Sequence, residues 1–147
     1  GVTLSNGLGW SPDDRTMYHI DTPTLAVAAY DYDADTGDIS NRRVAVAIPG
    51  TMGMPDGMCV DDEGMLWVAL WGGREVTRWD PSTGALLERI GIPALNVSSC
   101  AFGGRDRDEL YVTTARVGTD TAQYPLAGGL FVLKPGVRGR AGNLFAG

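Results

Sequence analysis

The stretch PDGMCVDDEGMLWVAL, residues 55–70, contains the structural unit from which most of this chain is built. An acid, Asp56, stands between a proline and a glycine, directly before a short apolar run. A charged turn follows, and then a second apolar run centred on Trp67. Short apolar runs rich in β-branched and aromatic residues, bounded by turn signals, predict β-strands. The stretch therefore predicts a hairpin with an acidic residue at the entrance to its first strand.

Two other stretches repeat this pattern, namely SNGLGWSPDDRTMYHID at residues 5–21 and VSSCAFGGRDRDELYVTT at residues 97–114. Their matching opening positions are Asn6, Asp56 and Ser98, spaced by about 50 and then about 42 residues. Repeats of this length, each with about four short strands, are typical of propeller blades. We therefore predict an all-β chain that forms a partial β-propeller of about three four-stranded blades. The expected blades are residues 1–54, 55–96 and 97–147.

The opening positions of the repeats are the candidate functional residues. In a propeller the first strand of each blade runs along the central channel. We therefore expect Asn6, Asp56 and Ser98 to be neighbours at the axis. Gly7 and Gly57 follow two of them and are expected where the backbone turns tightly or closely approaches another segment. The competing interpretation is that Asn6 and Asp56 only cap the entry to their strands, as Asx side chains often do.

Composition and charge restrict the class of partner. The net charge of −6 argues against nucleic acid or an anionic membrane surface, because both require a basic surface. No apolar run reaches the roughly 18–20 residues that span a bilayer, and the first residues show no charged-then-apolar leader. Cys59 and Cys100 lie in apolar strand-like runs and are expected to be free thiols in a reducing compartment. A cytoplasmic location is therefore expected.

Five ordered motifs resemble the regucalcin/gluconolactonase family of senescence marker protein-like lactonases. They are SNGLGWSPDDRTMYHID, YDYDADTGDISNRR, PDGMCVDDEGMLWVA, SSCAFGG and AGGLFVL, and together they extend over nearly the whole chain. The resemblance implies a six-bladed propeller of about twice this length, with one divalent metal at the axis and hydrolytic activity on sugar lactones or related esters. Only the C-terminal half of such a protein is matched, so half of a six-bladed propeller is expected.

The resemblance also implies roles for individual residues. The Asn of the family's S-N-G-L motif corresponds to Asn6 and the Asp of its P-D-G-M motif to Asp56. Both are expected to be ligands of the metal, which is Ca²⁺, Zn²⁺ or Mn²⁺. Asp56 is also the expected catalytic residue, and it either removes a proton from the attacking water or only holds an activated water in place. A glutamate ligand and a substrate-binding arginine from the family's first half have no counterpart here.

Further residues are expected to line the substrate site. These are Ser98, Ser99 and Arg116, the last of which begins the long segment 116–129. The competing interpretation of the two serines is that they only pack in the channel. His19, the only histidine, falls in the second strand of its blade and is expected to be structural. The run DYDADTGD, residues 31–38, lies in the second motif, and its acids are spaced like the first ligands of an EF-hand loop. The twelfth position of such a loop would be Arg42, which cannot bind calcium, so a surface turn is expected instead. The near-alternating spacing of Trp67, Trp71 and Trp79 predicts core between the blades, and the competing interpretation is a platform for a ligand.

Three blades cannot close a ring, and their apolar end faces require partners. The expected partner is a missing N-terminal half, as another chain or as the remainder of a trimmed enzyme, or else a second copy of this chain. Two functions follow from the sequence. The first is metal-dependent hydrolysis of a small sugar lactone by the completed propeller. The alternative is a non-catalytic calcium-binding or scaffolding fragment.

Overall fold

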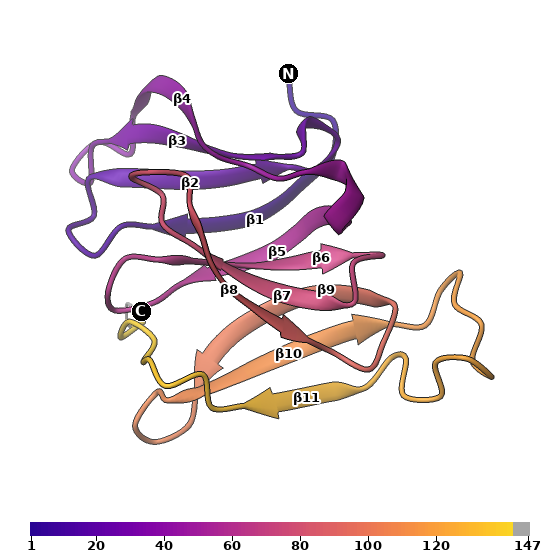
Figure 1. The fold of residues 1–147 in the computed structure, drawn as a ribbon. Helices are drawn as coiled ribbons and strands as arrows, with labels where there is room; N and C mark the ends of the chain where they lie inside the picture. Colours follow the sequence, from indigo (N-terminus) through magenta and orange to yellow (C-terminus); the bar gives the residue numbers. More distant parts are fainter. Residues whose placement is uncertain (143–147) are drawn as a thin grey trace.

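Three antiparallel β-sheets are stacked side by side along the molecule (Figure 1). The computed structural model describes residues 1–142. Within each sheet the strand order follows the chain order, so each sheet is a simple meander. Its strands are joined by short turns, except that the long segment 116–129 joins the last two strands of the third sheet. The predicted all-β class is confirmed, and the three sheets have the arrangement of neighbouring propeller-like blades.

The strands have the following bounds. The first sheet consists of β1 (Ser5–Trp10), β2 (Thr16–Asp21), β3 (Ala26–Tyr32) and β4 (Ile39–Ala47). The second consists of β5 (Met54–Val60), β6 (Leu66–Trp71), β7 (Glu75–Trp79) and β8 (Leu86–Gly91). The third consists of β9 (Asn96–Gly103), β10 (Glu109–Ala115) and β11 (Leu130–Leu133). Two short 3₁₀ turns, η1 (Thr22–Thr24) and η2 (Gly50–Met52), follow β2 and precede β5. Within residues 1–142 the third sheet therefore has three strands, where four were expected.

Local turn chemistry explains the hairpin between β3 and β4. The Asp33 carboxylate accepts the backbone N–H of Asp35 at 2.9 Å, and Gly37 adopts the left-handed φ of 79° that closes the turn. The equivalent turn between β7 and β8 is built in the same way, with Asp80 accepting from Ser82 at 2.8 Å. The acidic run at residues 31–38 is therefore a strand end and a hairpin turn, as expected.

The first strand of each sheet packs against the first strand of the next sheet. β1 contacts β5, and β5 contacts β9. A Cβ atom on Gly7 would lie 2.9 Å from the backbone nitrogen of Met58, and one on Gly57 would lie 2.8 Å from Cα of Ser99. Because these separations are too short for any side chain, both glycines are required for the close approach of neighbouring strands. The expectation for Gly7 and Gly57 is confirmed.

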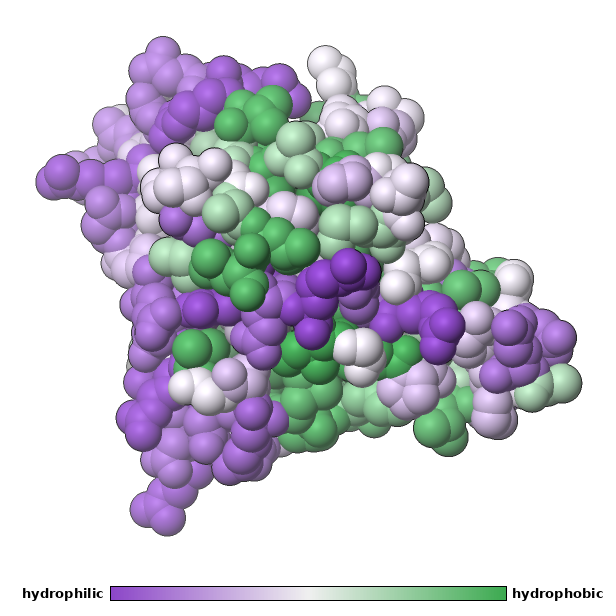
Figure 2. Space-filling model, in the orientation of Figure 1, coloured by the Kyte–Doolittle hydropathy of each residue, from purple (hydrophilic) through white to green (hydrophobic). Residues whose placement is uncertain are grey.

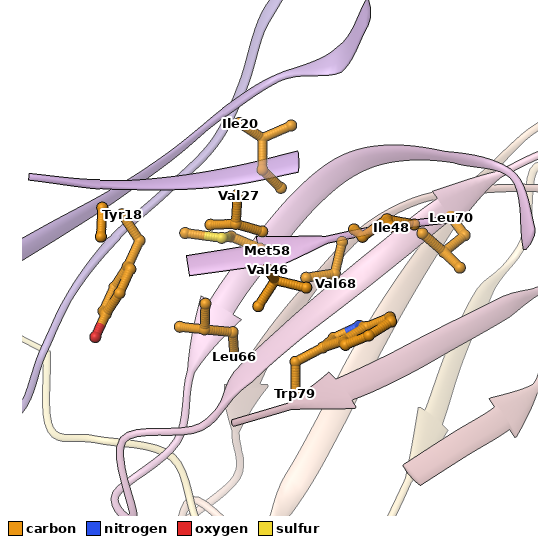
Figure 3. Close-up of a cluster of buried hydrophobic side chains, with 11 residues drawn as sticks. Tyr18, Ile20, Val27, Val46, Ile48, Met58, Leu66, Val68, Leu70 and Trp79 are labelled. Atoms are coloured by element: carbon orange, nitrogen blue, oxygen red, sulfur yellow. The ribbon is translucent and has the colours of Figure 1, made fainter. Parts of the chain in front are cut away.

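Two hydrophobic cores lie between the sheets. One lies between the first and second sheets (Figure 3) and includes Ile20, Val27, Val46, Met58, Leu66, Val68 and Trp79. The other lies between the second and third sheets and includes Trp67, Val76, Val97, Leu110 and Val112. Full burial of each large apolar side chain stabilises the fold by about 1.5–3 kcal/mol. Trp67 and Trp79 are thus core residues as predicted, whereas Trp71 is only half-buried at the end of β6.

The segment after β11 ties the hairpin turns of the three sheets together. Gly139 donates its backbone N–H to the Arg107 carbonyl at 2.8 Å and forms an isolated antiparallel bridge with Asp61. The guanidinium of Arg140 then donates to both carboxylate oxygens of Asp14 at 2.8 and 2.7 Å. Turns that are far apart in the chain are therefore joined at one edge of the molecule, where hydrophilic side chains gather (Figure 2). None of the helical segments in residues 1–142 has the length and hydropathy needed to span a membrane.

Candidate metal and active site

Each sheet carries an irregularity at the same place in its first strand. In β1, Asn6 and Gly7 together lie opposite a single residue of β2. In β5, Asp56 and Gly57 likewise lie opposite a single residue of β6. In β9, Ser98 is the extra residue opposite β10. One extra residue in a strand is a β-bulge, which re-aims a side chain out of the regular alternation of the sheet.

The three bulges lie near the beginnings of strands that are neighbours in space. Since β1 contacts β5 and β5 contacts β9, the three inner strands lie next to one another (Figure 1). Asn6, Asp56 and Ser98 each lie within the first three residues of one of these strands. All three side chains are half-buried. The first strands of the three sheets are therefore neighbours, and each carries a bulge at the position of its candidate residue.

A buried threonine links the first bulge to the second. The amide Nδ2 of Asn6 donates to Thr22 Oγ1 at 2.7 Å, and the Thr22 hydroxyl donates to the carbonyl of Pro55 at 2.8 Å. Because a carbonyl can only accept, the Thr22 proton points to Pro55, and the hydroxyl oxygen accepts from the –NH₂ group of Asn6. This chain of bonds orients the amide and leaves Asn6 Oδ1 with no hydrogen bond to any residue in 1–142.

The carboxylate of Asp56 is the second candidate ligand. It accepts no hydrogen bond from the part of the chain that the structure describes, residues 1–142, and burial raises its pKa above the ordinary value. A half-buried carboxylate without a donor is electrostatically costly, and a nearby cation would offset that cost. The environment of Asp56 therefore suits a bound cation better than a structural cap.

The residues present fit half of a hard-cation site. An amide oxygen and a carboxylate oxygen are ligands of the kind that Ca²⁺ binds, and Ca²⁺ takes about 6–8 oxygens in total. Within residues 1–142, no three His, Cys, Asp or Glu side chains come together as a complete metal cluster. Asn6 and Asp56 would thus supply two protein oxygens, and water or other protein groups would supply the rest.

Ser98 and Ser99 lie on β9 beside β5. The Ser98 hydroxyl is hydrogen-bonded to Thr113 Oγ1 at 2.9 Å, and the Ser99 carbonyl accepts from the same threonine at 3.4 Å. Ser99 also forms the surface against which Gly57 packs. These contacts hold both serines on β9, with Ser99 next to the bulge of β5.

Arg116 begins the long segment 116–129, directly after β10. Its Nε donates to the Ala127 carbonyl at 3.2 Å, so the exposed side chain is held against its own loop. Asn96, which is 4% exposed, anchors the loop by donating from Nδ2 to the Val117 carbonyl at 3.0 Å. Because Ala115 pairs with Asn96 at the start of β9, Arg116 lies at the same end of the sheet as the bulges. No hydrogen bond within residues 1–142 connects it to Asn6 or Asp56.

Two residues that position the site were not identified from the sequence. Thr22 follows β2, and Asn96 opens β9, and both are buried polar side chains whose partners lie far away in the chain. The only available signal for Asn96 was its place at the start of the third repeat. His19 lies on β2, where its Nε2 is 2.9 Å from the Ser5 hydroxyl, which is compatible with the structural role expected for it.

Comparison with known proteins identifies the family of the chain. The family model described as SMP-30/Gluconolactonase/LRE-like region matches residues 1–116. Regucalcin of Danio rerio is 48% identical over 142 residues, which cover 94% of this chain and 48% of that protein. The structure of a calcium-binding protein, regucalcin, from Agrobacterium tumefaciens strain C58 has a TM-score of 0.88 at 33% identity and covers 95% of this chain and 48% of its own.

A gluconolactonase from Xanthomonas campestris is also similar, with a TM-score of 0.65 at 34% identity over 76% of this chain and 35% of that one. The chain spans about half the length of the curated relatives that it matches. The family model extends over most of the residues that form the three sheets, including Asn6 and Asp56. The chain therefore belongs to the SMP-30/gluconolactonase/LRE-like family.

Proposed function

We propose that this protein hydrolyses a small sugar lactone with the help of one divalent metal ion, and that Asn6 and Asp56 are ligands of that ion. The observation that carries the proposal is the repeated bulge, which presents an amide oxygen and a carboxylate from neighbouring inner strands. The Thr22 bridge supports it, because it orients Asn6 with its Oδ1 unused within residues 1–142. The regucalcin and gluconolactonase relatives support the same assignment.

Lactone hydrolysis requires a base and an orienting surface. Water adds to the carbonyl carbon, the ring C–O bond breaks, and the leaving ring oxygen takes up a proton. The Asp56 carboxylate would accept the proton from the attacking water and could return it to that oxygen. A bound divalent cation supplies polarisation of the carbonyl group. Ser98, Ser99 and Arg116 would bind the hydroxyl groups of the sugar at the same end of the strands.

The oxygen donors favour some metals over others. Amide and carboxylate oxygens suit Ca²⁺ and Mn²⁺, whereas Zn²⁺ is more often held by nitrogen and sulfur ligands. We therefore rank Ca²⁺ and Mn²⁺ above Zn²⁺. Two protein oxygens make a weak site, so the half-propeller would need a completing partner. That partner is the other half of a six-bladed propeller, or a second copy that would bring two Asn6/Asp56 pairs to one axis.

The test is a lactonase assay on a sugar lactone with added Ca²⁺, Mn²⁺ or Zn²⁺, beside a chelator-treated sample. Asp56→Asn should abolish turnover, while Asp62→Asn, at an exposed aspartate in the following turn, should leave turnover unchanged. Asn6→Ala should raise the metal concentration needed for activity. Full activity of the Asp56→Asn protein, or activity unaffected by chelation, would remove this mechanism.

A second function, non-catalytic calcium binding or scaffolding, is supported by the Agrobacterium relative, which is described as a calcium-binding protein. The same two side chains would then take up Ca²⁺ without turning over a substrate. Calorimetric titration with Ca²⁺ separates the two functions when it is combined with the assay. Ca²⁺ binding that depends on Asp56, without hydrolysis of any lactone tested, would favour the second function.

A further inference from the structure

Two cysteines from adjacent sheets lie side by side. Cys59 on β5 and Cys100 on β9 have their Sγ atoms 3.7 Å apart, although 41 residues separate them in the chain. Both are free thiols. The Cys100 side chain is almost fully buried, and its Sγ also lies 3.3 Å from the Trp67 carbonyl. Cys59 is half-buried and is the more accessible of the two.

The close approach of the two strands explains the short sulfur–sulfur distance. Gly57, two residues before Cys59, packs directly on Ser99, the residue before Cys100. The same contact that places the Asp56 bulge beside the third sheet therefore also places the two thiols together. Both side chains lie at the core between the second and third sheets, where side chains are closely packed.

We propose that Cys59 and Cys100 form a reversible disulfide that links the second and third sheets when the protein meets a peroxide or an oxidised low-molecular-weight disulfide. The sulfur atoms must approach from 3.7 Å to the S–S bond length of about 2.05 Å. Closing this gap requires both side chains to rotate towards each other. The bond would join β5, which carries Asp56, to β9, which carries Ser98 and Ser99.

The reaction with a peroxide balances as follows. The sulfur of Cys59 attacks one peroxide oxygen, the O–O bond breaks, and one water leaves with the thiol proton, so that Cys59 becomes a sulfenic acid. The sulfur of Cys100 then attacks the Cys59 sulfur, and the S–O bond breaks. The departing hydroxyl takes the Cys100 proton and leaves as a second water. The two sulfurs lose two electrons in total, and the peroxide gains them.

Burial and the neighbouring thiol moderate this reaction. The hydrogen bond with Cys100 and then burial raise the pKa of Cys59 well above that of an ordinary cysteine. Since the thiolate is the nucleophile, Cys59 reacts slowly while it stays protonated. The pair is therefore expected to remain reduced in a thiol-rich compartment and to become oxidised only under sustained oxidant. Such transient disulfides are the kind found in intracellular proteins.

The experiment treats the purified, reduced protein with hydrogen peroxide or with oxidised glutathione. Free thiols are then counted after denaturation, and the digested protein is examined by mass spectrometry. We expect both thiols to disappear together and a cross-linked peptide pair containing Cys59 and Cys100 to appear, with a mass loss of about 2 Da that dithiothreitol reverses. The oxidised protein should melt about 5–10 °C higher than the reduced protein.

Two single variants serve as controls. Cys59→Ser and Cys100→Ser should each leave one thiol that forms no internal cross-link and gives no oxidant-induced rise in Tm. The measurement on the unaltered protein does not depend on the folding of either variant. Persistence of both thiols under conditions that oxidise an exposed cysteine in a reference protein would overturn the proposal. Cross-links only between separate chains, or separate glutathione adducts on both cysteines, would overturn it as well.

Discussion

The side-chain amide of Asn6 is bonded to the hydroxyl of Thr22 at 2.7 Å, and this contact determines which atom of the amide is left for a ligand. The hydroxyl proton is committed to the Pro55 carbonyl at 2.8 Å, so only the Asn6 nitrogen can face Thr22. The residue that positions Asn6 thereby also contacts the residue before Asp56. One buried hydroxyl thus couples the two candidate ligands.

Removing this hydroxyl should weaken metal binding without removing a ligand. Thr22→Val keeps the shape of the side chain but leaves the Pro55 carbonyl without its donor, and we expect a loss of about 1–3 kcal/mol in unfolding free energy. The amide of Asn6 would then be free to rotate, so metal affinity should fall by about tenfold. Chemical unfolding and calorimetric titration measure the two effects. Thr51→Val, at an exposed threonine in η2, is the matched control and should change neither. Unchanged metal affinity in Thr22→Val would contradict the coupling.

Asp56→Asn should make the metal-free protein slightly more stable at neutral pH. Burial raises the pKa of Asp56, so the folded state disfavours the charged form, and the carboxylate destabilises the fold at any pH above its folded pKa. The gain on neutralisation should be less than about 1 kcal/mol, because solvent screens a half-exposed group. Thermal melts with and without Ca²⁺ provide the measurement: Ca²⁺ should raise the Tm of the unaltered protein but not of the variant. A less stable metal-free variant would show that the carboxylate has a structural role instead.

Gly57→Ala should disrupt the contact between β5 and β9. The added Cβ would meet Cα of Ser99 at 2.8 Å, where only backbone movement can relieve the clash, and overpacking of this kind costs about 1–3 kcal/mol. Gly91→Ala is the matched control, because a Cβ there meets nothing within 4 Å. Urea unfolding should show a large loss for the first variant and little change for the second. Equal stability of the two proteins would mean that the inner strands are not closely packed at Gly57.

Arg140→Gln should destabilise the protein in a pH-dependent manner. The hydrogen bond from Arg140 lowers the pKa of Asp14 below its unfolded value of 3.8. The pair therefore stabilises the folded protein fully at pH values above 3.8, and this stabilisation is lost as the pH falls through the lower pKa of the folded state. The difference between Arg140→Gln and the unaltered protein should therefore be present at pH 7 and shrink towards pH 3. Urea unfolding across that range tests this. Arg105→Gln, at an exposed turn position, should show no such difference. A difference independent of pH would assign the effect to packing of the arginine.

Asn96→Ala should loosen the segment 116–129. The buried amide holds the Val117 carbonyl at 3.0 Å and Thr119 Oγ1 at 3.2 Å, so its loss should cost about 1–3 kcal/mol locally. Limited proteolysis should then cut within this segment faster than in the unaltered protein. Gln123→Ala, an exposed change in the same segment, should not alter the cleavage rate. If the segment covers the substrate, Asn96→Ala should also raise KM more than it lowers kcat.

Much of this architecture could be predicted from short stretches of the chain. The alternation of apolar runs and turn residues is a local property, so the three repeats, the all-β class and the hairpin turn at residues 31–38 followed from the amino-acid order. Because equivalent positions in repeated sheets occupy equivalent places, the neighbourhood of the three inner strands that carry Asn6, Asp56 and Ser98 could also be predicted. Gly57 was recognisable for the same reason, since a glycine beside a strand entrance signals a close approach.

Other features depend on contacts between residues that are distant in the sequence. The Thr22 bridge, the anchoring of Val117 by Asn96 and the tie from Arg140 to Asp14 are hydrogen bonds whose partners meet only after the sheets have packed. The approach of Cys59 to Cys100 has the same origin. A local pattern specifies each strand and its two faces, but the packing of one sheet on the next decides which distant side chains meet. The oriented amide of Asn6 and the facing thiols are therefore properties of the folded chain alone.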